Sequence, residues 1–198
     1  MPQSSSYFIL FVVSLGFTLA TCSSEQRVME KQPLVTAVFP SSDTLPANLL
    51  RFYIHFSQPM KTFGNLEHIK LLSETGEEIK NAIFNNVYEL WDAEQQQLTI
   101  ILDPARVKTG LKANEEFGRA LTKGNTYQLS IEELEDIHHR KLAAPFVKKF
   151  YATTADTISP DFENWLIAPP PAQTKLSLNV HFLDIADHFS AQQRIRLT

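Results

Sequence analysis

The sequence is poor in the residues that build covalent frameworks. It contains one cysteine in 198 residues, so no internal disulfide can form and no zinc-ribbon spacing exists. Glycine is also scarce, with 6 residues against 14 phenylalanines. This composition suits neither a disulfide scaffold nor a low-complexity linker, and a domain built from it has to rest on a packed apolar core.

Positive charge is not concentrated anywhere along the chain. The formal net charge is −4 and no cluster of lysine and arginine stands out, which argues against nucleic acid as a partner. The sequence also lacks G-x-S-x-G, H-E-x-x-H and a glycine-rich phosphate loop. We therefore predict no catalytic residue, no metal site and no cofactor, and we do not expect an enzyme.

The single cysteine, Cys22, lies directly behind an uncharged apolar run that extends from Tyr7 to Ala20. This run is shorter than the about 20 residues that a membrane-spanning helix needs, and it has the length of a signal-peptide core. The residues Leu19-Ala20-Thr21-Cys22 resemble the end of a bacterial lipoprotein signal. The resemblance implies that residues 1–21 are a signal peptide and that lipidated Cys22 anchors the chain to a membrane.

Two alternatives to lipidation stay open. Ordinary signal peptidase cleaving after Ala20 would release a secreted or periplasmic soluble protein with an unpaired thiol. An uncut apolar segment would instead remain as a membrane anchor. Thr21 stands where lipoprotein signals usually carry Gly, Ala or Ser, and the leader before Tyr7 contains no lysine or arginine.

From residue 34 onward, short apolar runs alternate with turn residues. In the clearest run, Leu50 to Phe56, the apolar side chains of Leu50, Phe52, Ile54 and Phe56 are expected on one face and the remaining three on the other. Seven or eight such runs within residues 34–155 predict an all-β fold, an Ig-like antiparallel β-sandwich of about seven strands. The longer stretch 105–121 is expected to be an ordered crossing loop with one helical turn.

The segments on either side of this domain have a different pattern. The polar residues of 22–33, which follow the signal peptide, are predicted to form a tether. Beyond residue 155, Pro169-Pro170-Pro171 indicates a stiff linker, and Lys175–Phe182 repeats the alternation of Leu50–Phe56. Because an Ig-like unit needs roughly 100 residues, we interpret 156–198 as a linker and a truncated second Ig-like unit.

One short motif carries a resemblance to a known family. Phe56-Ser57-Gln58-Pro59-Met60 resembles the F-S-x-P-M signature of bacterial Ig-like domains of the SbsA type, found in surface-layer and other exported proteins. Tyr127–Ile131 and Phe150–Thr153 resemble the last strands of that family. The family usually closes its final hairpin with Asp-x-x-Gly, whereas Asp136-Ile-His-His-Arg140 contains no glycine here. The resemblance implies an exported structural or binding module.

Two groups of side chains are candidate ligand sites. Residues 132–139 hold four carboxylates and two imidazoles, which Ca²⁺ or zinc accept as ligands. We interpret them as a solvated hairpin tip, because adjacent histidines on a strand point to opposite faces. Trp91 and Trp165 are the candidate contacts for a stacked sugar ring, although an aromatic residue at a strand end more often packs on the core.

The sequence thus predicts an exported, membrane-anchored lipoprotein of the bacterial cell envelope. Its Ig-like domain is expected to be a structural or protein-binding module for envelope proteins, with sheet edges that accept a partner strand. The alternative is an accessory carbohydrate-binding module for surface polysaccharide, which would use Trp91 and Trp165.

Overall fold

The computed structural model describes residues 31–85, 88–107, 110–158 and 161–182. The chain divides into two compact units, Met1–Lys31 and Gln32–Thr198, and the fold belongs to the second unit. The predicted signal peptide and Cys22 lie outside the described residues. The boundaries expected for the signal peptide, the tether and the Ig-like domain therefore stay predictions.

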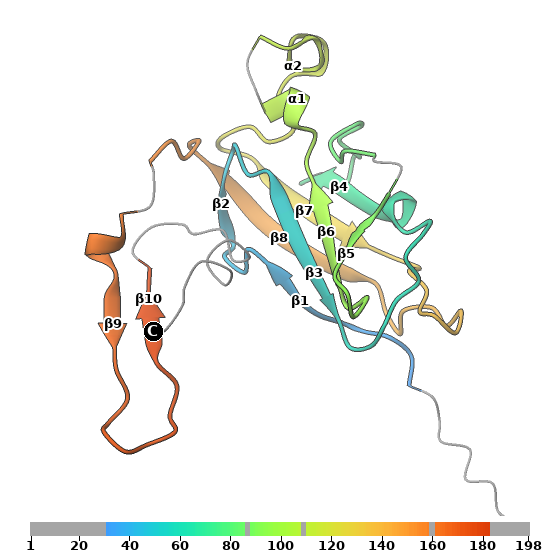
Figure 1. Ribbon diagram of the computed structural model, residues 1–198. Helices are drawn as coiled ribbons and strands as arrows, with labels where there is room; N and C mark the ends of the chain where they lie inside the picture. The colour runs from blue at the N-terminus through green and yellow to red at the C-terminus, as the bar shows by residue number, and fades with distance from the viewer. Residues whose placement is uncertain (1–30, 86–87, 108–109, 159–160, 183–198) are drawn as a thin grey trace, which may run out of the picture. The chain divides into compact units, whose positions relative to one another are not determined.

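In the described part of the second unit, eight strands form two four-stranded sheets that stack face to face (Figure 1). The first sheet has the order β1 (Val35–Phe39), β3 (Arg51–Phe56), β6 (Gln97–Ile101) and β5 (Leu90–Trp91). The second has the order β2 (Thr44–Pro46), β8 (Phe146–Thr153), β7 (Thr126–Ile131) and β4 (Ile69–Ser73). The predicted all-β sandwich is confirmed.

The first two strands belong to different sheets although they follow each other closely in sequence. β1 pairs antiparallel with β3, whereas β2 pairs parallel with β8. Pro40, which follows β1, has no N–H to donate, so the ladder with β3 ends there. The remaining strand pairs of the two sheets are antiparallel. The sandwich is thus antiparallel except at this one pair.

Alternate residues of the strands fill the space between the sheets. Phe52 and Ile54 of β3 are completely buried, and the Phe52 ring centroid lies 5.5 Å from that of Phe150 on β8. Burying each such side chain contributes roughly 1.5–3 kcal/mol. The other fully buried large side chains of the strands are Leu45, Leu71, Leu98, Ile100, Leu129 and Ile131.

Two residues of the clearest predicted strand differ from expectation. Leu50, expected in the core, is 36% exposed because it precedes β3, which begins at Arg51. Tyr53, expected on the solvent face, is only 2% exposed. The outer face of β3 is therefore closed to water at this point, which a period-two pattern alone does not predict.

The crossing loop between β6 and β7 contains two short helices, α1 (Pro104–Val107) and α2 (Lys112–Phe117). The expected helical turn is thus present twice. In Figure 1 both helices lie beyond one end of the sheets. A further turn, the 3₁₀ helix η1 (Leu66–His68), leads directly into β4.

The last described residues contain the 3₁₀ helix η2 (Phe162–Asn164) and an antiparallel pair, β9 (Leu166–Ala168) with β10 (Asn179–His181). The strand predicted at residues 175–182 is therefore shorter than expected, and Leu176 is 65% exposed. The truncated second Ig-like unit stays a prediction, because residues 183–198 lie outside the described part.

Candidate functional site

The segment that resembles the family signature forms the corner after β3. Phe56 and Met60 are both buried in the core. Between them, the N–H of Ser57 donates to the carbonyl of Leu34 over 2.9 Å, and the N–H of Leu34 donates to Oγ of Ser57 over 3.0 Å. The motif therefore fastens the start of the domain to the end of β3, which is a structural role.

Gln58, at the variable position of the signature, reaches the loop that precedes β8. Its Nε2 donates to Oδ2 of Asp136 over 2.5 Å, and Nε of Arg140 donates to the same oxygen over 2.6 Å. The backbone N–H groups of His138 and Arg140 donate to Oδ1 over 2.9 and 2.8 Å. Burial raises the pKa of Asp136, but the hydrogen bonds from Arg140, His138 and Gln58 together hold that pKa below its ordinary value.

The carboxylate-rich stretch 132–139 is only in part the solvated tip that the sequence predicts. Glu133, His138 and His139 are exposed, whereas Leu134 and Asp136 are completely buried. His139 has φ +61°, a left-handed conformation, where the family carries glycine. Within the described ranges, no group of three or more histidine, cysteine, aspartate or glutamate side chains is placed to hold a metal ion.

Each of the two tryptophans packs on an aromatic neighbour. The ring of Trp91, on β5, lies 5.6 Å from that of Phe56, and its Nε1 donates to Glu89 over 2.9 Å. The ring of Trp165, just before β9, meets Phe182 edge-on at 4.6 Å. Both tryptophans are half-buried. Sugar stacking on them stays a prediction, since the contacts described are those of packing.

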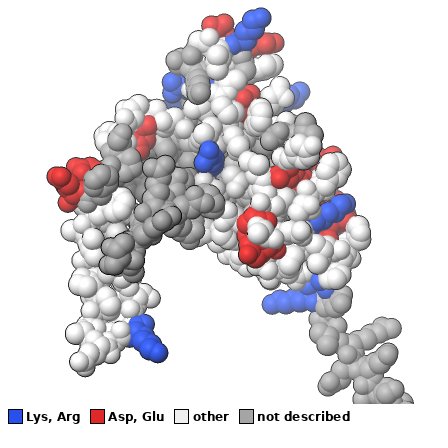
Figure 2. Space-filling view, viewed as in Figure 1, with Lys and Arg blue, Asp and Glu red and all other residues white. Residues whose placement is uncertain are grey.

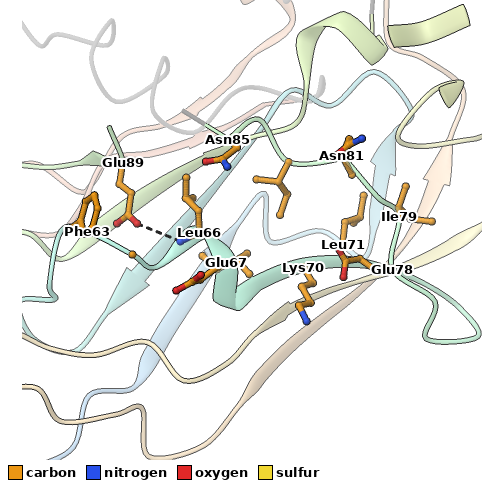
Figure 3. A pocket seen from close by; sticks show the side chains of 14 residues that line it. Phe63, Leu66, Glu67, Lys70, Leu71, Glu78, Ile79, Asn81, Asn85 and Glu89 are labelled. Atoms are coloured by element: carbon orange, nitrogen blue, oxygen red, sulfur yellow. Dashed lines mark hydrogen bonds between the residues drawn. The ribbon is translucent and has the colours of Figure 1, made fainter. Parts of the chain in front are cut away.

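A groove of about 550 Å³ lies between β4 and residues 78–85, which run beside the end of β6 (Figure 3). Its lining is apolar in the interior, with Leu66, Leu71 and Ile79, and polar at the rim. The rim side chains include Glu67, Lys70, Glu78, Asn81 and Asn85. We call it the β4 groove; its size suits a small ligand.

Glu89 fixes one end of the β4 groove. Its carboxylate accepts a hydrogen bond from the backbone N–H of Leu66 over 3.3 Å (Figure 3) and another from that of Asn65 over 2.5 Å. It also accepts from Nδ2 of Asn65 over 2.8 Å and from Trp91. Because these donors occupy the carboxylate, Glu89 orders the loop that carries Phe63 and the start of η1.

Several aromatic side chains beside the β4 groove are open to water. Phe63 is 73% exposed and Tyr88 is 77% exposed, and Phe84 and Leu90 are also exposed. Phe84, Tyr88 and Leu90 line a neighbouring depression that shares Leu66 and Glu89 with the groove. Sequence reasoning passed over these residues in favour of the tryptophans. The signal was present, since Phe63 and Phe84 each stand beside turn-forming Gly or Asn.

The opposite edge of the second sheet carries a second groove, of about 710 Å³, between β1 and the first half of β8. We call it the β8 groove. β2 pairs only with Tyr151–Thr153, so the preceding residues of β8 have no partner strand on that side among the residues described. β8 is therefore an edge strand over its first half and an inner strand over its second.

The hydrogen bonds of β8 show which of its backbone groups point outward. The N–H of Ala152 donates toward β7, to Asn125, whereas the N–H of Tyr151 donates the other way, to Asp43 over 2.8 Å. Successive residues of an antiparallel strand alternate in this respect. The N–H and C=O groups of Val147 and Lys149 therefore point away from β7, toward the β8 groove.

Lys148 is directed into the sandwich at this edge. It is 8% exposed, and its Nζ donates to the carbonyls of Ser41 and Ser42 over 3.0 Å each. Burial lowers the pKa of Lys148, and nearby Asp43 offsets part of that change. Lys148 is one of the residues that line the β8 groove.

Arg106 of α1 is the other strongly buried cation of the described chain. It is 3% exposed and donates only to backbone carbonyls: Nη1 to Lys80 over 2.7 Å, Nε to Gly118 over 2.9 Å, and Nη2 to Phe117 and Arg119 over 3.0 and 3.3 Å. Burial lowers its pKa. The guanidinium thereby holds the crossing loop together and ties it to residues 78–85, which form one side of the β4 groove.

Charge and hydropathy of the described surface are unremarkable in two respects. On the face in Figure 2, acidic and basic side chains are interspersed among uncharged ones, without a broad basic stripe over the described residues there. No described helix combines the length and the apolar character that crossing a membrane requires.

No protein-family model matches the chain, and no curated protein matches it in sequence. Among solved structures, the chain is similar to the S-layer protein rSbsC(31-844), with 13% identity and a TM-score of 0.41 over 69% of this chain and 15% of that one. Domains 1–6 of SbsC give 13% identity and a TM-score of 0.42 over 70% and 15%.

A third similar structure is native alpha-2-macroglobulin from Escherichia coli, domains MG0-NIE-MG1, with 12% identity and a TM-score of 0.37 over 66% of this chain and 34% of that one. Likenesses with TM-scores below 0.5 assign neither a family nor a function. Membership of the SbsA type stays an expectation from the sequence.

Proposed function

We propose that this chain is an exported protein of the bacterial cell envelope and that its β-sandwich is a structural, protein-binding module. The observation that carries the binding role is the half-covered edge of β8. Outward N–H and C=O groups at such an edge need partners, and an added strand supplies them.

The domain that carries that edge suits a rigid module. Buried charged groups in two different parts of the chain, Asp136 and Arg106, each hold several backbone groups in place. The Ser57–Leu34 pair fixes the point at which the preceding chain joins the domain. A sheet edge on such a scaffold is preorganised, which lowers the entropic cost of binding.

The membrane anchor is part of the same proposal and rests on the apolar run before Cys22. Mass spectrometry of the N-terminal peptide from native membranes should find acylated Cys22 and no residues from 1–21. Cys22→Ser should move the protein from the membrane to the soluble fraction. An unmodified N-terminus at Thr21 would contradict lipidation and favour release as a soluble protein.

Protein binding at the β8 edge can be tested in cells. A photo-crosslinking benzoylphenylalanine in place of Val147, which is 45% exposed, should give an adduct with an envelope protein. The same group in place of the exposed turn residue Glu94 is the matched control. The adduct should disappear when Lys149→Pro is added, and an adduct that persists or forms equally at position 94 would count against the role.

Carbohydrate binding is the second candidate, favoured by exposed Phe63 and Tyr88 beside the β4 groove. Aromatic faces open to water stack on the apolar faces of sugar rings, and this pair is more exposed than either tryptophan. Phe63→Ala with Tyr88→Ala should lower the affinity for envelope polysaccharide at least tenfold without changing the melting temperature. Ile158→Ala, at an equally exposed residue elsewhere, is the control.

A further inference from the structure

We propose that the β8 groove accepts one extended segment of a partner protein, which adds to the second sheet beside the first half of β8 and places an acidic side chain against Lys148. The proposal rests on the protein-binding role and specifies the chemistry of the partner.

The position of the added strand follows from the backbone. β2 covers β8 only from Tyr151 onward, and the next outward groups belong to Lys149 and Val147. A strand in line with β2 would pair with both residues and continue the existing edge. Two residues with outward N–H and C=O groups offer a ladder that β2 leaves unfilled in the described chain.

The walls of the β8 groove set the side-chain pattern of that strand. Phe39 of β1 lies on one wall, and Phe146 and Phe150 of β8 line the other. Because successive side chains of a strand point to opposite faces, every second residue of the segment would enter between these rings. Apolar side chains are expected at those positions except beside Lys148, and the intervening ones would face solvent.

Lys148 adds a requirement for negative charge. Two carbonyls, those of Ser41 and Ser42, accept from its Nζ, and Asp43 is the acidic residue close to it. A carboxylate attracts a buried ammonium more strongly than a neutral carbonyl does, because two opposite charges then interact where the dielectric constant is low. A carboxylate on the added strand would complete the environment of Lys148, and Lys149 beside it increases the positive potential.

The same lysines disfavour a second copy of this chain as the occupant. Two β8 edges paired antiparallel would bring Lys148 and Lys149 of one copy next to those of the other. Like charges opposite each other destabilise a strand pair. Lysine or an inward-pointing charge at a sheet edge commonly prevents two such edges from pairing. The charge pattern therefore selects a different, acidic segment.

The test uses the purified full chain in detergent and two nine-residue peptides that alternate valine and threonine. The peptides differ only at the central residue, which is aspartate in one and lysine in the other. NMR-detected hydrogen exchange should show at least tenfold slower exchange of the Val147 and Lys149 amides with the aspartate peptide. Fluorescence anisotropy should show at least tenfold weaker binding of the lysine peptide.

Two matched pairs of variants sharpen the test. Lys149→Pro removes the outward N–H without touching the ladder with β7 and should abolish binding, whereas Lys149→Ala keeps that N–H and should bind with little change. Lys148→Met should bind both peptides equally well, while Lys148→Arg should keep the preference for aspartate. Circular dichroism checks that each variant is folded.

The proposal is overturned if neither peptide slows exchange at Val147 and Lys149, or if the protected amides lie beside β4. Equal binding of the two peptides by the unmodified chain would also overturn the requirement for an acidic residue. These outcomes are distinct from failure of the proposed function, since a crosslink at position 147 and acylated Cys22 are measured independently in cells.

Discussion

Arg106 and Lys148 are both buried cations whose hydrogen bonds go to backbone carbonyls, yet their surroundings differ. Arg106 binds four carbonyls, three of them inside the crossing loop and one, that of Lys80, on a distant segment of the chain. Lys148 binds two consecutive carbonyls and borders a groove. The planar guanidinium of Arg106 directs its N–H donors at carbonyls on several sides. The ammonium of Lys148 is a compact charge, and this lysine lines a groove.

The contrast separates a structural charge from one that can take part in recognition. Removing Arg106 would leave several buried carbonyls without donors. Removing Lys148 would release only two, at an edge that water can reach. Burial alone does not distinguish the two roles, since their exposed fractions are 3% and 8%; the number and location of the partners do.

The largest effect is expected for Arg106→Met. Orphaned carbonyls at Lys80, Gly118 and neighbouring positions should lower the free energy of unfolding by at least about 3 kcal/mol. Arg106→Lys should lose less, because an ammonium has three donors. Urea denaturation measures both, and a loss below about 1 kcal/mol for Arg106→Met would contradict the structural role.

A buried anion extends the comparison to the opposite sign. Asp136→Asn keeps the shape but loses the charge that Arg140 and Gln58 contact, so we expect a loss of about 2–3 kcal/mol at pH 7. The lowered pKa of Asp136 means that the unfolded chain takes up its proton first as the pH falls. The stability it contributes should be present above its ordinary pKa of 3.8 and disappear as the pH falls through the lower folded value.

Thermal melts of the unmodified chain and Asp136→Asn between pH 2 and 7 check this dependence. The difference between the two proteins should shrink toward acid. A difference that does not change with pH would mean that the carboxylate is not the charged species in the fold.

The expected effect of Lys148→Met on stability is smaller, about 1 kcal/mol in either direction at pH 7, because losing two hydrogen bonds offsets the gain from removing a buried charge.

The pH dependence of the stability that Lys148 contributes is a more specific test. The pKa of Lys148 in the folded chain lies below its ordinary value of 10.5. At a pH between the folded and the ordinary pKa, the unfolded chain holds a proton that the folded chain has released. Stability from this group should therefore rise with pH in that window, and urea titrations at pH 7 to 10 should show the rise missing in Lys148→Met. An equal rise in both would place its cause elsewhere.

The smallest effect concerns strain at a position without a buried charge. His139 adopts φ +61°, which costs a residue with a Cβ about 1–2 kcal/mol. Glycine avoids this cost but loses more entropy on folding. His139→Gly should therefore stabilise the domain by about 0.5 kcal/mol, seen as a slightly higher melting temperature. His138→Gly, one residue earlier, is the control and should not stabilise it.

The sequence predicted best what period-two alternation governs. Phe52, Ile54 and Phe56 are buried as expected. Leu50 differed because a strand boundary cannot be read from alternation to within one residue. Asp136 could not be recognised among its acidic neighbours, since its partner Gln58 is far away in sequence and meets it only in the fold.

The candidate sites were harder to predict than the fold for a related reason. Trp91 and Trp165 were chosen by residue type, yet the more exposed aromatic side chains are Phe63 and Tyr88. Arg106 has no sequence signal, because its partners are backbone carbonyls that any residue could supply. The uncovered half of β8 depends on where β2 begins and ends, which is set by the pairing of two segments about a hundred residues apart.

The parallel pairing of β2 with β8 bears on how the domain carries load. A pull on the chain before β1 and after β8 draws these two neighbouring strands in opposite directions along their length. All the hydrogen bonds between them are then stretched together, whereas strands pulled apart from one end break them one at a time. Under such a pull, this three-residue strand would resist extension of the domain through all of its hydrogen bonds at once.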